Sequence, residues 1–174
     1  HSWCMSADVA VIGAGPSGAW TAYLLASRGA RVLLVDPSHP REKPCGGGVT
    51  GRALSLVAEA LPAATLPAVH VRTARFVDSR EGTSATVPLP AHAIRDPLVV
   101  VSRLSFDGLL LAAARSAGAE LLQVRATDVS RTATGFRIDT ADGTVREAAF
   151  VVGADGATSL VRRRLGHAFS RGQL

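Results

Sequence analysis

A strand–turn–helix signature near the amino terminus constrains this chain more than any other feature. The run ADVAVIGAGPSG at residues 7–18 begins with apolar residues that predict a buried strand over 8–13. Gly13, Gly15 and Gly18 then give the spacing G-x-G-x-x-G at the start of a predicted helix. In such a unit the first glycine permits a tight turn, the second lets the backbone approach a pyrophosphate, and the third lets the helix pack on the strand.

An acidic residue at the end of the second predicted strand supports the same interpretation. The run VLLVD ends at Asp36, 18 residues after Gly18. A ribose-binding acid is expected about 20 residues after the glycine turn, and the N–H groups at the helix N-terminus favour a phosphate. A glycine turn used only for packing would leave Asp36 unexplained. The sequence therefore predicts a dinucleotide-binding unit.

Composition and charge narrow the class of protein further. The chain has 174 residues, 47% of them hydrophobic and 19% charged, so a compact soluble domain is expected. Its net charge of +5 comes from arginines scattered along the sequence, which predicts no nucleic-acid partner. We expect no transmembrane segment and a cytoplasmic protein, compatible with peripheral membrane contact. Cys4 and Cys45 form neither a disulfide framework nor a metal-binding pattern, so no metal site is predicted.

The order of the predicted elements indicates a parallel sheet followed by a meander. Helices are predicted over 16–28, 50–60, 106–117 and 157–165, with Ser102 or Ser105 capping the third. Strands are predicted over 8–13, 31–36, 69–78, 84–90, 98–103, 119–123, 126–131, 135–140 and 144–154. The stretch from Pro37 to Gly48 is rich in proline and glycine and predicts a loop.

Three consecutive glycines mark that loop as more than a connection. A structural turn needs one or two glycines and seldom three, so Gly46, Gly47 and Gly48 indicate a backbone approached by a flat ligand. Cys45, immediately before them, could be a nucleophile or a redox thiol. Because no partner cysteine is near it in the sequence, packing against a ligand or substrate is the preferred interpretation.

Five motifs occur here in an order that resembles FAD-dependent oxidoreductases. They are GAGPSG, the acid after the second strand, KPCGGGV, R-x-x-F-D-x-x-L from Arg103 to Leu110, and GADG-x-x-S-x-V-R from Gly153 to Arg162. The chain resembles the geranylgeranyl reductase family most closely, and more broadly the para-hydroxybenzoate hydroxylase-type flavoproteins. The resemblance covers nearly the whole chain from Ala7 onward, and P-C-G-G-G is its specific part.

The resemblance implies a binding residue for each part of FAD. The pyrophosphate would be bound by Gly13, Gly15, Ser17 and Gly18. Asp36 would hold the adenosine ribose, and Ala126 would meet the adenine through its backbone. Along the flavin the resemblance places Cys45, Gly46, Gly47 and Gly48, and Arg103 would make a charge-assisted contact with FAD. Asp155 and Gly156 would lie near the pyrophosphate and the reduced nicotinamide cofactor.

The resemblance also implies a fold and a division of the chain. We expect a Rossmann-like FAD-binding three-layer β/β/α domain with a parallel sheet and a three-stranded β-meander. Residues 5–174 would be its N-terminal part, with 62–100 belonging to an inserted substrate domain. The third family motif, G-D-A-x-G, is absent from this sequence. The expectation is therefore that the C-terminal half, with the catalytic residues, lies elsewhere in a longer enzyme.

The implied activity is the reduction of carbon–carbon double bonds in a prenyl chain. FAD would be the cofactor, NAD(P)H or another donor would supply the electrons, and an apolar prenyl or aromatic small molecule would be the substrate. A flavin-dependent monooxygenase or halogenase on the same scaffold is the first alternative. The second is a non-catalytic truncated fragment that binds FAD weakly or not at all.

Overall fold

The computed structural model describes residues 7–62, 65–89 and 98–166. The chain divides into a first unit, formed by residues 1–41 and 107–174, and a second unit, formed by residues 42–106. No helix within the described ranges is long and apolar enough to cross a membrane.

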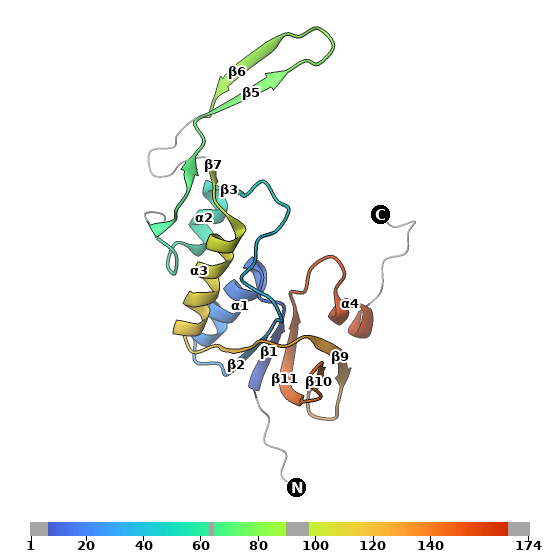
Figure 1. Ribbon diagram of the computed structural model, residues 1–174. Helices are drawn as coiled ribbons and strands as arrows, with labels where there is room; N and C mark the ends of the chain where they lie inside the picture. The colour runs from blue at the N-terminus through green and yellow to red at the C-terminus, as the bar shows by residue number, and fades with distance from the viewer. Residues whose placement is uncertain (1–6, 63–64, 90–97, 167–174) are drawn as a thin grey trace. The chain divides into compact units, whose positions relative to one another are not determined.

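The first unit is built on a six-stranded sheet in the order β8–β2–β1–β11–β10–β9 (Figure 1). Strands β8, β2, β1 and β11 run parallel, whereas β9, β10 and β11 form an antiparallel meander. The strands are β1 (Ala7–Ile12), β2 (Val32–Val35), β8 (Glu120–Leu122), β9 (Ala126–Arg131), β10 (Phe136–Thr140) and β11 (Val145–Gly153). The expected parallel sheet with a three-stranded meander is confirmed.

Strand β1 lies inside the sheet and pairs with a parallel strand on each side. Ala10 pairs with Leu33 of β2 on one side and with Val151 of β11 on the other, and both pairings are parallel. The carboxyl ends of these three strands therefore meet at one edge of the sheet. In open α/β sheets, ligands bind at such an edge, where the strand order reverses.

The two faces of this sheet are covered by different elements. Helix α1 (Pro16–Ala26) lies against β1 and β2, and its buried Ala19 and Ala22 carry side chains small enough for close approach. Helix α4 (Leu160–Leu165) packs Val161 against the cluster that contains Ile12 and Ile138. Apolar burial on both faces stabilises the layered arrangement.

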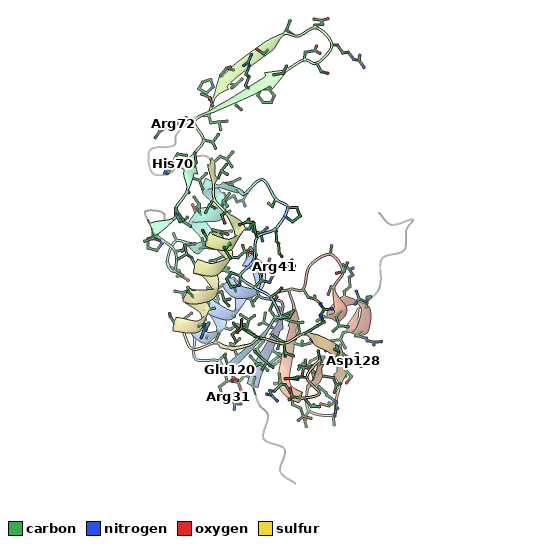
Figure 2. The ribbon with its side chains drawn as sticks, in the orientation of Figure 1. Arg31, Arg41, His70, Arg72, Glu120 and Asp128 are labelled. Carbon is green, nitrogen blue, oxygen red and sulfur yellow. The ribbon has the colours of Figure 1, made fainter. Side chains whose placement is uncertain are left out.

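Polar contacts at the rim tie neighbouring elements of the first unit together. Arg31, just before β2, reaches Asp8 of β1 at 2.7 Å, and Asp128 of β9 accepts from Arg164 of α4 at 2.6 Å. Figure 2 labels Arg31 and Asp128 at these positions. The second contact fixes α4 against the meander that carries it.

The second unit contains a small sheet, a short helix and a hairpin (Figure 1). The sheet has the order β3–β7–β4, with β3 (Gly48–Thr50), β7 (Leu98–Val100) and β4 (Val69–His70). Helix α2 (Gly51–Val57) begins where Thr50 Oγ1 accepts from the N–H of Ala53. The hairpin pairs β5 (Thr73–Val77) with β6 (Ser84–Pro88).

Helix α3 (Arg103–Ser116) begins earlier than the sequence predicts. The expected start at Phe106 and the expected strand through Arg103 are wrong, because β7 ends at Val100 and Ser102 caps the helix. Glu42 explains why the helix begins at Arg103. Its carboxylate accepts from the N–H groups of Arg103 and Leu104 and from Ser102 Oγ. A carboxylate at a helix N-terminus satisfies N–H groups that would otherwise be unpaired.

Several other predicted boundaries are corrected by strand pairing. The predicted strand over 69–78 is two strands, because His70 pairs with β7 whereas the residues from Thr73 onward pair with β6. The loop predicted through Gly48 ends in strand β3, which pairs with β7. Helix α4 begins at Leu160 instead of residue 157, since Ser159 Oγ accepts from the N–H of Arg162 and caps it.

Candidate functional site

The glycine turn after β1 contains two glycines that the fold itself requires. Gly13 has φ +101°, and a Cβ there would lie 2.4 Å from the carbonyl oxygen of Ala154. A Cβ on Gly18 would lie 1.8 Å from the carbonyl oxygen of Gly13. Both distances are far inside van der Waals contact, so any side chain at either position would force the turn apart. These two residues are glycine because α1 and the turn after β11 pack directly against the glycine turn.

Gly15 has no such reason to be glycine. Its backbone is at φ −65° and ψ −178°, a conformation open to any residue. A Cβ there would meet only His39 Nε2, at 3.7 Å, which is ordinary contact. Ser17, two residues later, is exposed. Neither backbone strain nor packing among the described residues requires glycine at position 15. Close approach of a ligand to the backbone is a physical reason for a glycine at such a position.

The N-terminus of α1 is suited to a negatively charged group. Gly15 is its N-cap and Pro16 its first residue, so within the described chain no side-chain oxygen caps the helix and no acid occupies its first turn. The first N–H groups of a helix lack partners within the helix, and the helix dipole adds positive potential there. A phosphate is the usual ligand of such a site.

Asp36 lies at the adjacent end of β2 and is buried. Its Oδ2 accepts from the N–H of Ala14 at 2.9 Å, and its Oδ1 accepts from the N–H groups of Ser38 and His39, both at 2.8 Å. Burial acts to raise the pKa of Asp36, but the hydrogen bonds from Ala14, Ser38 and His39 outweigh it and hold the pKa below its usual value. The group is therefore a carboxylate at neutral pH, joined directly to the glycine turn.

His39 is a residue of this region that sequence reasoning missed. Its ring is buried, with Nδ1 2.9 Å from Asp36 Oδ2 and Nε2 3.7 Å from Oδ2 of Asp107. Nε2 has no hydrogen-bond partner among the described residues. The loop sequence does not distinguish a buried histidine from an exposed one. Asp36 is only three residues away, but the burial of the ring depends on the fold, and Asp107 comes from a distant part of the sequence. The F-D motif marks Asp107 but not its neighbour in space.

The turn after β11 closes the same edge of the sheet. The N–H of Ala154 donates to the carbonyl of Ile12 at 2.8 Å, which joins this turn to the end of β1. Asp155 Oδ2 accepts from the N–H of Leu160 at 2.6 Å, whereas its Oδ1 is buried without a partner in the described structure. Gly156 has φ +81°, which favours glycine. Asp155 thus holds α4 in place with one oxygen and keeps the other available.

The remaining predicted residues are distributed between the units. Ala126 is the first residue of β9 and is half-buried opposite Thr140. Arg103 is the first residue of α3, in the second unit. Cys45, also in the second unit, carries an exposed thiol. The structure thus brings the glycine turn, Asp36 and the turn at Asp155 together at one sheet edge in the first unit.

The three glycines of the second unit separate into two kinds. Gly47 is buried with φ +68°, and a Cβ there would lie 2.4 Å from the carbonyl oxygen of Val101, so the fold requires it. Gly46 and Gly48 are exposed. A Cβ on Gly46 would meet nothing within 4 Å, and one on Gly48 would meet only Leu98 Cδ1 at 3.6 Å. A ligand near this loop is therefore indicated by Gly46 and Gly48 and not by Gly47.

Together these features define a class of protein. A parallel strand–turn–helix unit with an uncapped helix N-terminus and a carboxylate on the next strand is a dinucleotide-binding domain. The FAD binding domain family matches residues 6–173, and the chain belongs to that family.

Relatives of known name include two reductases. A menaquinone reductase of Mycobacterium tuberculosis (strain ATCC 25618 / H37Rv) is 35% identical over 172 residues, covering 95% of this chain and 41% of the relative. A geranylgeranyl diphosphate reductase of Rhodobacter capsulatus is 31% identical over 166 residues, covering 92% of this chain and 40% of the relative. The chain therefore spans about two fifths of the length of these relatives.

Solved structures with the same fold include oxygenating and halogenating enzymes. The anhydrotetracycline hydroxylase OxyS of Streptomyces rimosus matches with a TM-score of 0.74 at 27% identity, over 95% of this chain and 35% of that one. A mutant of the halogenase PltM in complex with FAD matches with a TM-score of 0.77 at 23% identity, over 96% of this chain and 38% of that one. The Rossmann-like fold and the FAD-binding family of the chain are confirmed.

The described residues fit FAD as the ligand. The uncapped helix N-terminus and the side-chain-free face of Gly15 suit a pyrophosphate. Asp155 Oδ1 is a buried acceptor that still needs a donor.

Proposed function

We propose that this chain supplies the dinucleotide-binding part of an FAD-dependent reductase that acts on the double bonds of a prenyl chain. The observation that carries the FAD site is Gly15: its backbone is unstrained and its Cβ position is open, and the approach of a ligand to this backbone explains the missing side chain. Bound FAD would supply the hydride chemistry, with NAD(P)H as the donor of electrons. The chain's own residues bind and orient the cofactor.

In this proposal each part of the first unit has one task. The N–H groups near Gly15, Ser17 and Gly18 bind the pyrophosphate, and Asp36 binds the adenosine ribose. Asp155 lies beside the same turn, next to Ala154. Ala126 contributes backbone to the adenine, and in the second unit Cys45, Gly46, Gly48 and Arg103 serve the flavin end. Residues 62–100 belong to the substrate-binding part.

Replacement of Gly15 by alanine tests the FAD site. We expect Gly15→Ala to fold with an unchanged thermal midpoint, because its Cβ makes only ordinary contact with His39. Its affinity for FAD should fall by roughly tenfold or more, since the methyl group stands where the pyrophosphate approaches. FAD titration followed by flavin fluorescence measures this loss.

A matched glycine separates the ligand effect from a packing effect. A Cβ on Gly108 would also make an ordinary contact, with Pro40 at 3.5 Å, so Gly108→Ala should keep both stability and FAD affinity. Equal FAD affinity for wild type and Gly15→Ala would remove the glycine turn from the binding site and overturn the proposal.

Oxygen insertion is the competing chemistry, favoured by the likeness to a hydroxylase structure at 27% identity. The reductase assignment is supported by the names of the relatives at 35% and 31% identity and by the P-C-G-G-G motif. In the longer protein that carries this segment, anaerobic turnover of a geranylgeranyl substrate with NADPH should add hydrogen. Mass spectrometry of the product distinguishes added hydrogen from added oxygen, and an obligatory oxygen requirement would favour the monooxygenase.

A further inference from the structure

The carboxylate proposed to bind ribose is already fully hydrogen-bonded. Asp36 Oδ2 is in contact with the N–H of Ala14 and with Nδ1 of His39, and Oδ1 accepts from the N–H groups of Ser38 and His39. A carboxylate offers about four lone-pair positions, so these four contacts occupy them all. The side chain is also buried, with only 8% of its surface exposed. A ribose hydroxyl therefore has no acceptor position on Asp36 until one of these donors leaves.

Of the four donors, the His39 ring is the one that can leave without unfolding the turn. The N–H groups of Ala14, Ser38 and His39 are backbone groups, fixed by the glycine turn and by the turn after β2. The ring, by contrast, moves by side-chain rotation. Its other nitrogen, Nε2, has no hydrogen-bond partner in the described structure and is 3.7 Å from Asp107 Oδ2, beyond hydrogen-bond distance.

The ring also lies against both elements of the proposed cofactor site. Nδ1 is bound to Asp36, and Nε2 is 3.7 Å from the position that a Cβ on Gly15 would take. Because Asp36 is a carboxylate, Nδ1 must carry the proton of the shared hydrogen bond. The imidazole thus gives Asp36 the kind of donor that a ribose hydroxyl would give.

We propose that His39 is a positioning residue that competes with the adenosine ribose for Oδ2 of Asp36. Without ligand the imidazole occupies an acceptor position on Oδ2 of Asp36. A ribose hydroxyl takes that position when a dinucleotide binds. His39 thereby lowers the affinity for ligands that carry the ribose diol and leaves ligands without it unaffected. This inference rests on the proposed FAD site.

The test compares ADP with 2′,3′-dideoxy-ADP, which lacks both ribose hydroxyls. The measured quantity is the ratio of the two affinities, obtained by isothermal titration of the 174-residue chain; a general loss of stability affects both ligands and cancels in the ratio. In His39→Ala the preference for ADP should rise by roughly tenfold over wild type, the size of one hydrogen bond to a charged group. His39→Asn keeps a donor near the Nδ1 position and should retain the wild-type ratio.

A second variant covers the case in which alanine leaves the region unstable. His39→Leu fills the space without a donor and should raise the same ratio. An unchanged or lower ratio in the folded variants overturns the competition, as does binding of FAD without any binding of ADP. If no variant and no wild-type chain binds FAD, the proposed function itself fails. If all bind FAD and the ratio does not move, the proposed function stands and the role of His39 falls.

Discussion

At the scale of single residues, Asp142 shows how a turn can depend on one carboxylate. It lies in the hairpin between β10 and β11, where Gly143 takes φ +82°. Its Oδ1 accepts from Thr140 Oγ1 at 2.6 Å and from the N–H and Oγ1 of Thr144 at 3.0 and 2.9 Å. These bonds lower the pKa of Asp142 from 3.8 to about 2. Only the carboxylate form can accept all of them.

The pH dependence follows from the direction of that shift. Because the folded-state pKa is depressed, the contribution of Asp142 to stability is present above pH 3.8 and is lost as the pH falls toward about 2. Thr140→Val removes the largest of the causes at nearly constant volume, so the pKa of Asp142 should rise toward 3.8. Side-chain carboxyl NMR titration measures it.

A second threonine supplies the control for this titration. Thr127 Oγ1 donates to the carbonyl of Asp139 and makes no contact with Asp142 that the structure describes. Thr127→Val should therefore leave the pKa of Asp142 at about 2. An ordinary pKa in the wild-type protein, or the same low value in Thr140→Val, would show that the threonine hydroxyl does not stabilise the carboxylate.

The sequence was enough to predict the residues proposed for the dinucleotide site, but not what each of them does in the fold. The spacing of Gly13, Gly15 and Gly18 predicted the turn, yet only the structure shows which of the three the fold itself requires. For Gly13 the requirement depends on Ala154, which lies far away in the sequence and is brought to the turn by the pairing of β1 with β11, whereas for Gly18 it comes from the Gly13 carbonyl. The contact of the His39 ring with Asp36 is local, three residues apart, but the burial of that ring depends on the fold and has no signature in the local sequence.

At the scale of elements, the start of α3 depends on a residue outside the helix. Glu42 accepts from Ser102 Oγ at 2.7 Å and from the N–H groups of Arg103 and Leu104 at 3.1 and 3.4 Å. The hydrogen bond from Ser102 is the main cause that holds the pKa of Glu42 below its usual value of 4.5. The two residues are 60 positions apart in the sequence. Local helix signals alone therefore predict a start of α3 that is three residues too late.

Removal of this carboxylate should loosen the first turn of α3. In Glu42→Ala, the N–H groups of Arg103 and Leu104 lose their acceptor, and their amide hydrogen exchange should become faster. Ala117, whose N–H donates to Ala113 at the other end of the helix, is the internal control and should exchange as before. Two-dimensional NMR measures all three.

The role of the charge can be separated from that of the hydrogen bonds. Glu42→Gln keeps an acceptor oxygen and should protect the same amides partly. In the wild-type protein the protection should be full above pH 4.5 and should decline as the pH falls below it, because protonation removes the acceptor that the helix N-terminus favours. Unchanged exchange at Arg103 in Glu42→Ala would show that Ser102 alone begins the helix.

At the scale of the whole molecule, the alternation of strands and helices was enough to predict the layered α/β class. The division into two units was harder to predict, because it depends on which strands pair. The segment 69–78 shows this. Its first residues, through His70, pair with β7 of the small sheet, whereas the residues from Thr73 onward pair with β6 in the hairpin β5–β6. No feature of the hydrophobic pattern there marks the change.

Within the second unit, the hairpin β5–β6 leaves apolar side chains exposed, whereas Val49, Leu54 and Val99 outside it are buried. In the second unit every residue of β6 is exposed, and Phe76 and Val77 of β5 are each 64% exposed. Pairing of Ala74 with Val87 and of Phe76 with Ala85 places these four apolar residues on one face of the hairpin. Val77 pairs with Ser84 on the other, more polar face.

This asymmetry predicts where the molecule binds a hydrophobic dye. A contiguous exposed apolar face binds such dyes, whereas an isolated apolar side chain does not. Phe76→Ser should therefore lower dye fluorescence clearly, because it interrupts the apolar face formed with Ala85 and its neighbours. Val77→Ser is the matched control: its side chain is equally exposed at 64% but lies on the opposite face, so dye fluorescence should stay near the wild-type value.

Both substitutions are at exposed positions and should leave the free energy of unfolding within about 0.5 kcal/mol of wild type. A thermal scan beside the dye titration therefore separates loss of an apolar surface from loss of structure. Equal decreases in dye fluorescence for Phe76→Ser and Val77→Ser would show that the dye does not distinguish the two faces. The hairpin would then count as two exposed strands of equal character, and its alternation of apolar and polar residues would define no surface of the molecule.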